Sequence, residues 1–156
     1  MSLRVDQRKP TLVELDVYQK CLKLTDHTLS VCKVKESKTN NHHILKRQLK
    51  LGYKLVDLVI EIGANILEAN NIYVGNNLNA NDRITNYQKR IELQNNSKLL
   101  TYRMEHIIRV MHFNRPFADS TLTYWVSLLI ETRNLLIKWK EKDISNLNEL
   151  LKENKS

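Results

Sequence analysis

Apolar residues recur at intervals of three and four along four segments of the chain, with polar residues between them. This spacing places the apolar side chains on one face of an α-helix, so each segment is predicted to be an amphipathic helix. The predicted helices span about residues 11–33, 44–73, 81–113 and 119–142. Because the connections have ten residues or fewer, neighbouring helices are expected to alternate in direction. The sequence therefore predicts an all-α fold, an up-down antiparallel four-helix bundle.

Residue types that favour helix ends lie at several of these boundaries. A side-chain oxygen that accepts from the first free backbone N–H groups stabilises a helix start. The candidate N-terminal caps are Thr11 with Glu14 for the first helix, Asn81 or Asp82 for the third, and Asp119 or Ser120 for the fourth. Gly75 follows the second helix, where a glycine often ends a helix in a left-handed conformation.

The predicted bundle occupies residues 11–142 and is flanked by two short segments. Residues 1–10 form a basic arm, and residues 143–156 form a tail. The tail has apolar residues at Ile144, Leu147, Leu150 and Leu151. It is interpreted either as a short amphipathic helix or as a weakly packed end.

One polar residue, Asn65, falls on the apolar face of the second predicted helix. A buried Asn is costly unless it is hydrogen-bonded, and it can then fix how helices pack. Glu68, three residues further on, could complete such a polar clamp. If the helix is rotated, both side chains face water, and the spacing alone does not choose between these alternatives. Gly63 in the same helix is expected to mark the close approach of another backbone.

Charge adds a second feature to this picture. The chain has 25 Lys and Arg residues against 17 Asp and Glu, a formal net charge of +8 at pH 7. Residues 1–54 hold 12 of the basic and 5 of the acidic residues, and residues 83–115 hold 7 and 2. A well-solvated basic surface is one interpretation. The clustering favours a patch that attracts polyanions.

Two groups of basic residues are the candidate nucleic-acid-binding residues. In the first, basic residues recur every four positions on one helix face, and residues 44–56 include no Asp or Glu. The second group surrounds Tyr87, an aromatic residue that could stack on a base but at this spacing is more often part of a core. The candidates for contact with phosphates are Lys46, Arg47, Lys50 and Lys54 in the first group and Arg83, Lys89 and Arg90 in the second.

The sequence lacks the signals of membrane and exported proteins. No apolar run approaches the ~18 residues that cross a bilayer, and residues 1–10 have no apolar core. We therefore expect no membrane partner and a cytoplasmic location. Cys21 and Cys32 are eleven residues apart on one predicted helix, too far to bridge within it, so both are expected to be reduced thiols.

Signatures of catalysis are also missing from the sequence. There is no Glu-x-x-His motif of di-iron bundles and no Gly-rich phosphate loop. Arg103 and Arg109 lack a His at the spacing that helical ribonucleases use. His42 and His43 lie in a predicted loop, where a metal site is conceivable but a solvated loop is the favoured interpretation. We expect no enzyme activity, no catalytic residue, no cofactor and no metal.

Two short runs resemble one family of small four-helix bundles. The family includes bundle proteins encoded in ribosomal intervening sequences and the accessory variability determinant (Avd) of diversity-generating retroelements. Residues 62–70, Ile-Gly-Ala-Asn-Ile-Leu-Glu-Ala-Asn, are similar to its second-helix signature, and the last four are closer to the Avd branch. Leu128-Leu129-Ile130-Glu131, followed by Trp139, is similar to the Avd pattern in the fourth helix. This chain has Arg133 and Asn134 where the family often has Gly and Arg.

The resemblance covers about residues 18–142, and it implies a non-enzymatic role. An Avd protein is a homopentamer with a positively charged surface. It binds the reverse transcriptase of its retroelement, together with template RNA or its DNA copy, during mutagenic retrohoming. The resemblance also marks Asn65, Glu68, Glu131 and Trp139 as a structural polar motif. The alternative is a bundle that binds only protein and uses its basic face for an acidic partner surface.

Overall fold

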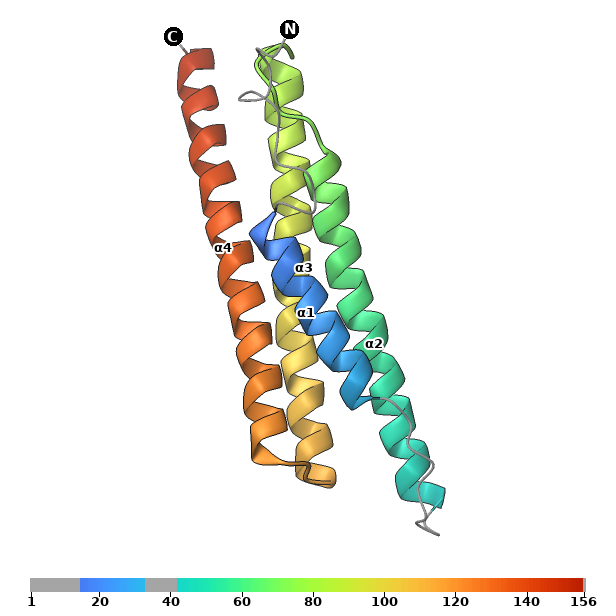
Figure 1. Ribbon diagram of the computed structural model, residues 1–156. Coiled ribbons are helices and arrows are strands. Elements are labelled where there is room, and N and C mark those ends of the chain that lie inside the picture. Colours follow the sequence, from blue (N-terminus) through green and yellow to red (C-terminus); the bar gives the residue numbers. More distant parts are fainter. Residues whose placement is uncertain (1–14, 33–41, 156) are drawn as a thin grey trace, which may run out of the picture.

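The computed structural model describes residues 15–32 and 42–155, with the backbone alone for residues 42–47. Within these ranges the chain forms four α-helices and no strand: α1 (Asp16–Val31), α2 (His42–Asn71), α3 (Ala80–Asn114) and α4 (Asp119–Lys155). Each helix contacts the next along the chain, and α1 also contacts α4, which closes the ring (Figure 1). The directions alternate, so the predicted up-down four-helix bundle is confirmed.

Helix α1 is much shorter than the other three and lies across α2 and α4 (Figure 1). Two pairs of small residues lie where it contacts α2. A Cβ atom added to Gly63 would lie 3.6 Å from Cys21 Sγ, and one added to Gly52 would lie 3.5 Å from Cys32 Cβ. The two glycines are eleven residues apart, and so are the two cysteines, Cys21 on α1 and Cys32 at its C-cap, so the two contacts match in an antiparallel register. Gly63 therefore faces a side chain, and not the backbone that the sequence suggested.

The core fills the space between the four helices with Leu, Ile, Val and Met side chains and one tryptophan. Trp125 of α4 is fully buried, and its indole Nε1 donates to Thr28 Oγ1 of α1 at 3.0 Å. The Thr28 hydroxyl in turn donates to the Leu24 carbonyl at 2.7 Å. Because the indole N–H has a partner, the largest side chain of the core is buried without an unpaired polar atom.

The helix ends differ in detail from the predicted caps. Asn79, and not Asn81 or Asp82, is the N-cap of α3, because the helix begins earlier than expected; its Oδ1 accepts from the Asp82 backbone N–H at 2.8 Å. Helix α4 begins at Asp119. None of the described residues has a positive φ, so Gly75 does not adopt the left-handed conformation. The pair Thr11 and Glu14 lies outside the described residues, as does the basic arm 1–10.

Two predicted boundaries are wrong. Helix α4 continues without interruption through residue 143 to Lys155, because Asp143 and Leu150 are buried and bind the end of the helix to the bundle. Residues 143–155 are therefore neither a separate helix nor a weakly packed end. His42 and His43 belong to α2 and not to the preceding loop.

The two cysteines are free thiols in the α1–α2 interface. Burial raises the pKa of each thiol from 9.0 to about 11. Since the thiolate is the reactive form, both side chains act as small packing residues in the folded protein. No helix in the described part of the chain is long and apolar enough to cross a membrane.

Candidate nucleic-acid interface

The first predicted basic group lies at the end of the bundle where α2 begins and α3 ends (Figure 1). Lys50 and Lys54 are exposed and one helical turn apart on α2. No ion pair within the described ranges includes either ammonium group, and the next acidic residue on α2 is Asp57. The side chains of Lys46 and Arg47 lie outside the described residues. The two described lysines are thus available to an anion in solution.

The second predicted group does not form such an array, because Arg90 is already bound within the bundle. Its Nε and Nη2 donate to the two carboxylate oxygens of Asp143 on α4, at 2.9 and 3.2 Å. The side chains of Arg90 and Asp143 are only 12% and 4% exposed. The guanidinium also lies over the ring of Trp139, 5.5 Å from its centroid, and Gln94 Nε2 donates to Asp143 at 2.7 Å. Arg90 is therefore a packing residue, and its assignment to phosphate contact is wrong.

The other two members of the second group, Arg83 and Lys89, differ in their surroundings. Arg83 Nε donates to the Val74 carbonyl at 3.2 Å and anchors the α2–α3 connection. Tyr87 is buried, which supports its interpretation as a core residue and leaves no ring face for a base. Lys89 is exposed. Arg90 reaches the carbonyl of Ile72, directly after α2 and 22 residues beyond Lys50, so the two groups lie roughly 30 Å apart at opposite ends of the bundle.

The four residues of the predicted polar motif do not meet one another. Asn65 is half-buried and Glu68 is exposed, and no hydrogen bond joins them among the described side chains, as expected for the rotated helix. Glu131 forms an exposed ion pair with Lys20 of α1 at 2.8 Å. Trp139 is half-buried beneath Arg90.

The structure instead places two other polar networks inside the bundle. One is the cluster of Arg90, Gln94 and Asp143 described above. The other joins Arg133 of α4 to α3: its Nε donates to Thr101 Oγ1 at 2.9 Å and its Nη2 to Glu105 Oε1 at 2.8 Å. Arg133 is 8% exposed, so it is not a free basic residue either.

The Glu105 carboxylate should make the stability of the bundle sensitive to acid. Hydrogen bonds from Arg133, and to a lesser degree from Arg109, lower the pKa of Glu105 below its ordinary value of 4.5. A carboxyl group with a lowered pKa in the folded state contributes stability above its unfolded-state pKa, and this is lost as the pH falls through the folded-state pKa.

We expect the free energy of unfolding of the wild type to fall more steeply between about pH 5 and pH 3 than that of Glu105→Gln. Urea titrations at several pH values measure both curves. Parallel curves would show that Glu105 does not contribute.

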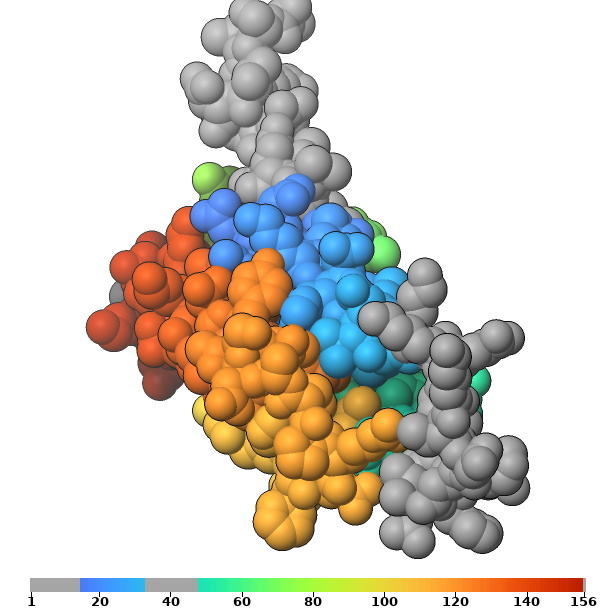
Figure 2. Space-filling model, turned by 60° about the horizontal axis from the view of Figure 1, so that its bottom comes forward, coloured from blue at the N-terminus to red at the C-terminus, as the bar shows by residue number. Residues whose placement is uncertain are grey.

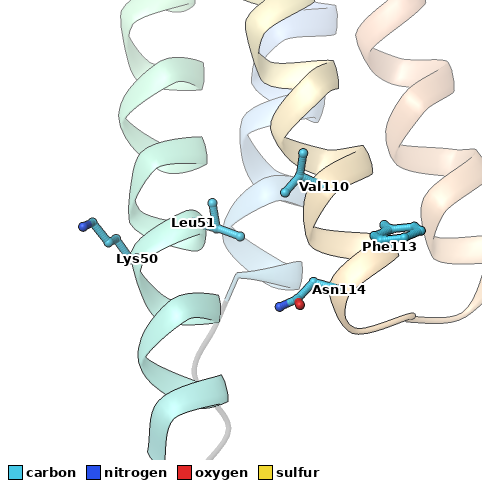
Figure 3. Close-up of a pocket in the computed structure, with 5 residues that line it drawn as sticks. All are labelled: Lys50, Leu51, Val110, Phe113 and Asn114. Atoms are coloured by element: carbon cyan, nitrogen blue, oxygen red, sulfur yellow. The ribbon is translucent and has the colours of Figure 1, made fainter.

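A shallow groove between α2 and α3 lies beside Lys50. It is lined by Lys50, Leu51, Val110, Phe113 and Asn114 and has a volume of about 350 Å³. Leu51 points from α2 toward α3, whereas the Lys50 ammonium and the Phe113 ring lie on the outer sides of the two helices (Figure 3). Figure 2 brings this end of the molecule forward and shows the α3–α4 connection on the surface beside α1.

None of the α3 residues of this groove was predicted from the sequence as a site residue. Phe113 is 90% exposed, the highest value among the large hydrophobic residues in the described ranges. A signal was present, because Phe113 comes two residues after Met111, and so lies off the apolar face that Met111 continues.

Comparison with protein-family models, curated proteins and solved structures finds no match to this chain. Within residues 15–32 and 42–155, no group of three His, Cys, Asp or Glu side chains could hold a metal ion.

Proposed function

We propose that this protein is a non-enzymatic module that binds RNA, or its DNA copy, through the Lys50 end of the bundle. The observation that carries the proposal is the exposed pair Lys50 and Lys54, with no carboxylate bound to it in the described structure. Cations held four residues apart repel one another, and contacts with phosphates relieve that repulsion while releasing counterions. The net charge of +8 favours the same class of partner.

The resemblance to Avd proteins gives this proposal a biological setting. In it, the bundle assists the reverse transcriptase of a diversity-generating retroelement in the cytoplasm and acts as a homo-oligomer, a pentamer. Several copies of the Lys50 end in one assembly would act together on one strand, so weak contacts would add up to useful affinity.

The test is the salt dependence of RNA binding. The affinity of wild type and of Lys50→Gln/Lys54→Gln for a single-stranded RNA is measured at several salt concentrations. Each phosphate contact with a single strand contributes about 0.7 to the slope of log affinity against log salt, so the variant should lose about 1.4 for each copy of the Lys50 end that contacts the strand.

Lys138→Gln/Lys142→Gln is the matched control. These lysines are also exposed and four residues apart, but they lie on α4. The control should keep the wild-type slope. Equal slopes for wild type and Lys50→Gln/Lys54→Gln would rule out this end of the bundle as the binding surface.

A bundle that binds only protein is the second candidate, and one feature of the surface favours it. Several large apolar residues are exposed at intervals of seven along α1 and α2, so each set lies on one helix face. They are Leu22 and Leu29 on α1, and Tyr53, Ile60 and Leu67 on α2. A protein that does not shift RNA in a gel at moderate salt would support this candidate over the first.

A further inference from the structure

We propose that the surface around the groove between α2 and α3 binds a single strand, with an unpaired nucleobase stacked on Phe113 while neighbouring phosphates contact Lys50 and Lys54. This inference rests on the proposed function and names the part of the nucleic acid that the site recognises. The shared chemistry is a base with a free face in a single strand, either RNA or DNA.

Phe113 has the properties of a stacking residue. It lies in the last turn of α3, is 90% exposed, and takes part in no ring contact among the described residues. Phe117, the other phenylalanine, packs instead against His112 and Trp125. An aromatic ring with free faces is costly to expose to water, and every base can stack on one.

The groove beside the ring fits a base better than a charged or bulky group. Its volume of about 350 Å³ lies at the lower end of the range for small-ligand sites, about 300–1,000 Å³. Leu51 and Val110 provide an apolar floor. The carboxamide of Asn114, which can both donate and accept hydrogen bonds, lies at the edge where the polar rim of a base would be.

The charges around the groove select a polyanion over a neutral apolar partner. Lys50 is the one charged residue among the described side chains that line it, and Lys54 follows one turn later. Arg115, directly after α3, is exposed as well. The ammonium of Lys50 and the ring of Phe113 lie on the outer sides of α2 and α3, so a strand that runs across both helices would meet both (Figure 3). A duplex would not, because its bases are already stacked on one another.

The experiment measures binding of Phe113→Ala to single-stranded oligonucleotides that contain 2-aminopurine, whose fluorescence is quenched on stacking. Loss of one stacked base should weaken binding about 5- to 150-fold. The quenching should disappear, whereas the slope against salt should stay that of the wild type, because the lysines remain. Phe113→Tyr should restore both affinity and quenching. RNA and DNA strands are tested in parallel, and a loss with either one supports the proposal and identifies the preferred strand.

Tyr73→Ala is the matched control, since Tyr73 is a half-exposed aromatic residue just beyond the opposite end of α2. It should bind as the wild type does. If the wild type binds RNA with the expected salt slope and Phe113→Ala binds equally well, the stacking site is wrong and the proposed function survives. If the wild type does not bind single strands at all, both are wrong.

Discussion

Asp143→Ala should lower the free energy of unfolding by about 3–5 kcal/mol, the largest loss expected from any single charged residue described in this bundle. The substitution would leave the Arg90 guanidinium, 12% exposed, without its carboxylate, and Gln94 Nε2 without its acceptor. Removing one partner of a buried pair costs far more than the net value of the pair, because the other charge stays buried. The turns of α4 that follow Asp143 should also loosen, because Asp143 and Leu150 are the buried residues that hold this part of the helix to the bundle.

Urea denaturation of three variants separates this effect from a general loss of charge. Glu131→Ala breaks the exposed ion pair with Lys20 and should cost less than about 1 kcal/mol. Arg90→Met/Asp143→Leu replaces both buried charges with apolar groups and should be less destabilised than Asp143→Ala alone. A loss below about 1 kcal/mol for Asp143→Ala would show that water reaches the pair and that the network does not hold α4 to α3.

Trp125→Ala should cost about 3–5 kcal/mol, because it removes the largest fully buried side chain of the core. The indole fills the space between α1 and α4, with the rings of His27 and Phe117 against it at 5.8 and 6.0 Å between centroids. The loss includes the cavity as well as the hydrogen bond to Thr28 Oγ1.

Trp125→Phe isolates the two contributions, since it keeps an aromatic ring and removes the indole N–H. It should recover a large part of the stability lost in Trp125→Ala. Chemical denaturation followed by far-ultraviolet circular dichroism gives both values. Equal stability of Trp125→Ala and wild type would mean that α1 is not packed on α4 as described.

The sequence predicted the helices well because their apolar spacing is sustained over many turns. On the predicted apolar face of α4, Trp125, Leu128 and Thr132 are buried and Leu135 and Trp139 are half-buried. Met104, Ile107 and Met111 are buried on α3. The first basic group was predicted from the same regularity, since residues on one helix face are exposed or buried together. Lys50 and Lys54 are exposed as expected. Phe113 was missed because its residue type does not suggest a site, and its exposure is known only from the structure.

The second basic group was predicted wrongly for a physical reason. Counting charges along α3 gives no information about partners on other helices. The carboxylate that binds Arg90 is 53 residues away, in a segment that was assigned to the tail. The spacing did contain a clue, because Asp143 lies four residues after Trp139 and so continues the buried face of α4. A polar residue there was taken as the end of the helix, although it is the acceptor of a buried pair.

The shortness of α1 has a consequence for how the chain assembles. Helix α2 contacts α3, and α3 contacts α4, so these three helices pack through contacts between neighbours in the chain. Contacts between neighbouring segments form faster than contacts between distant ones. The bond between Thr28 and Trp125 joins residues 97 positions apart, and it forms only after the ends of a long loop have met. With 16 residues, α1 is close to the length of about 12–15 residues below which even Ala-rich helices are marginal in water, so we expect it to hold its structure only when it is packed on α2 and α4.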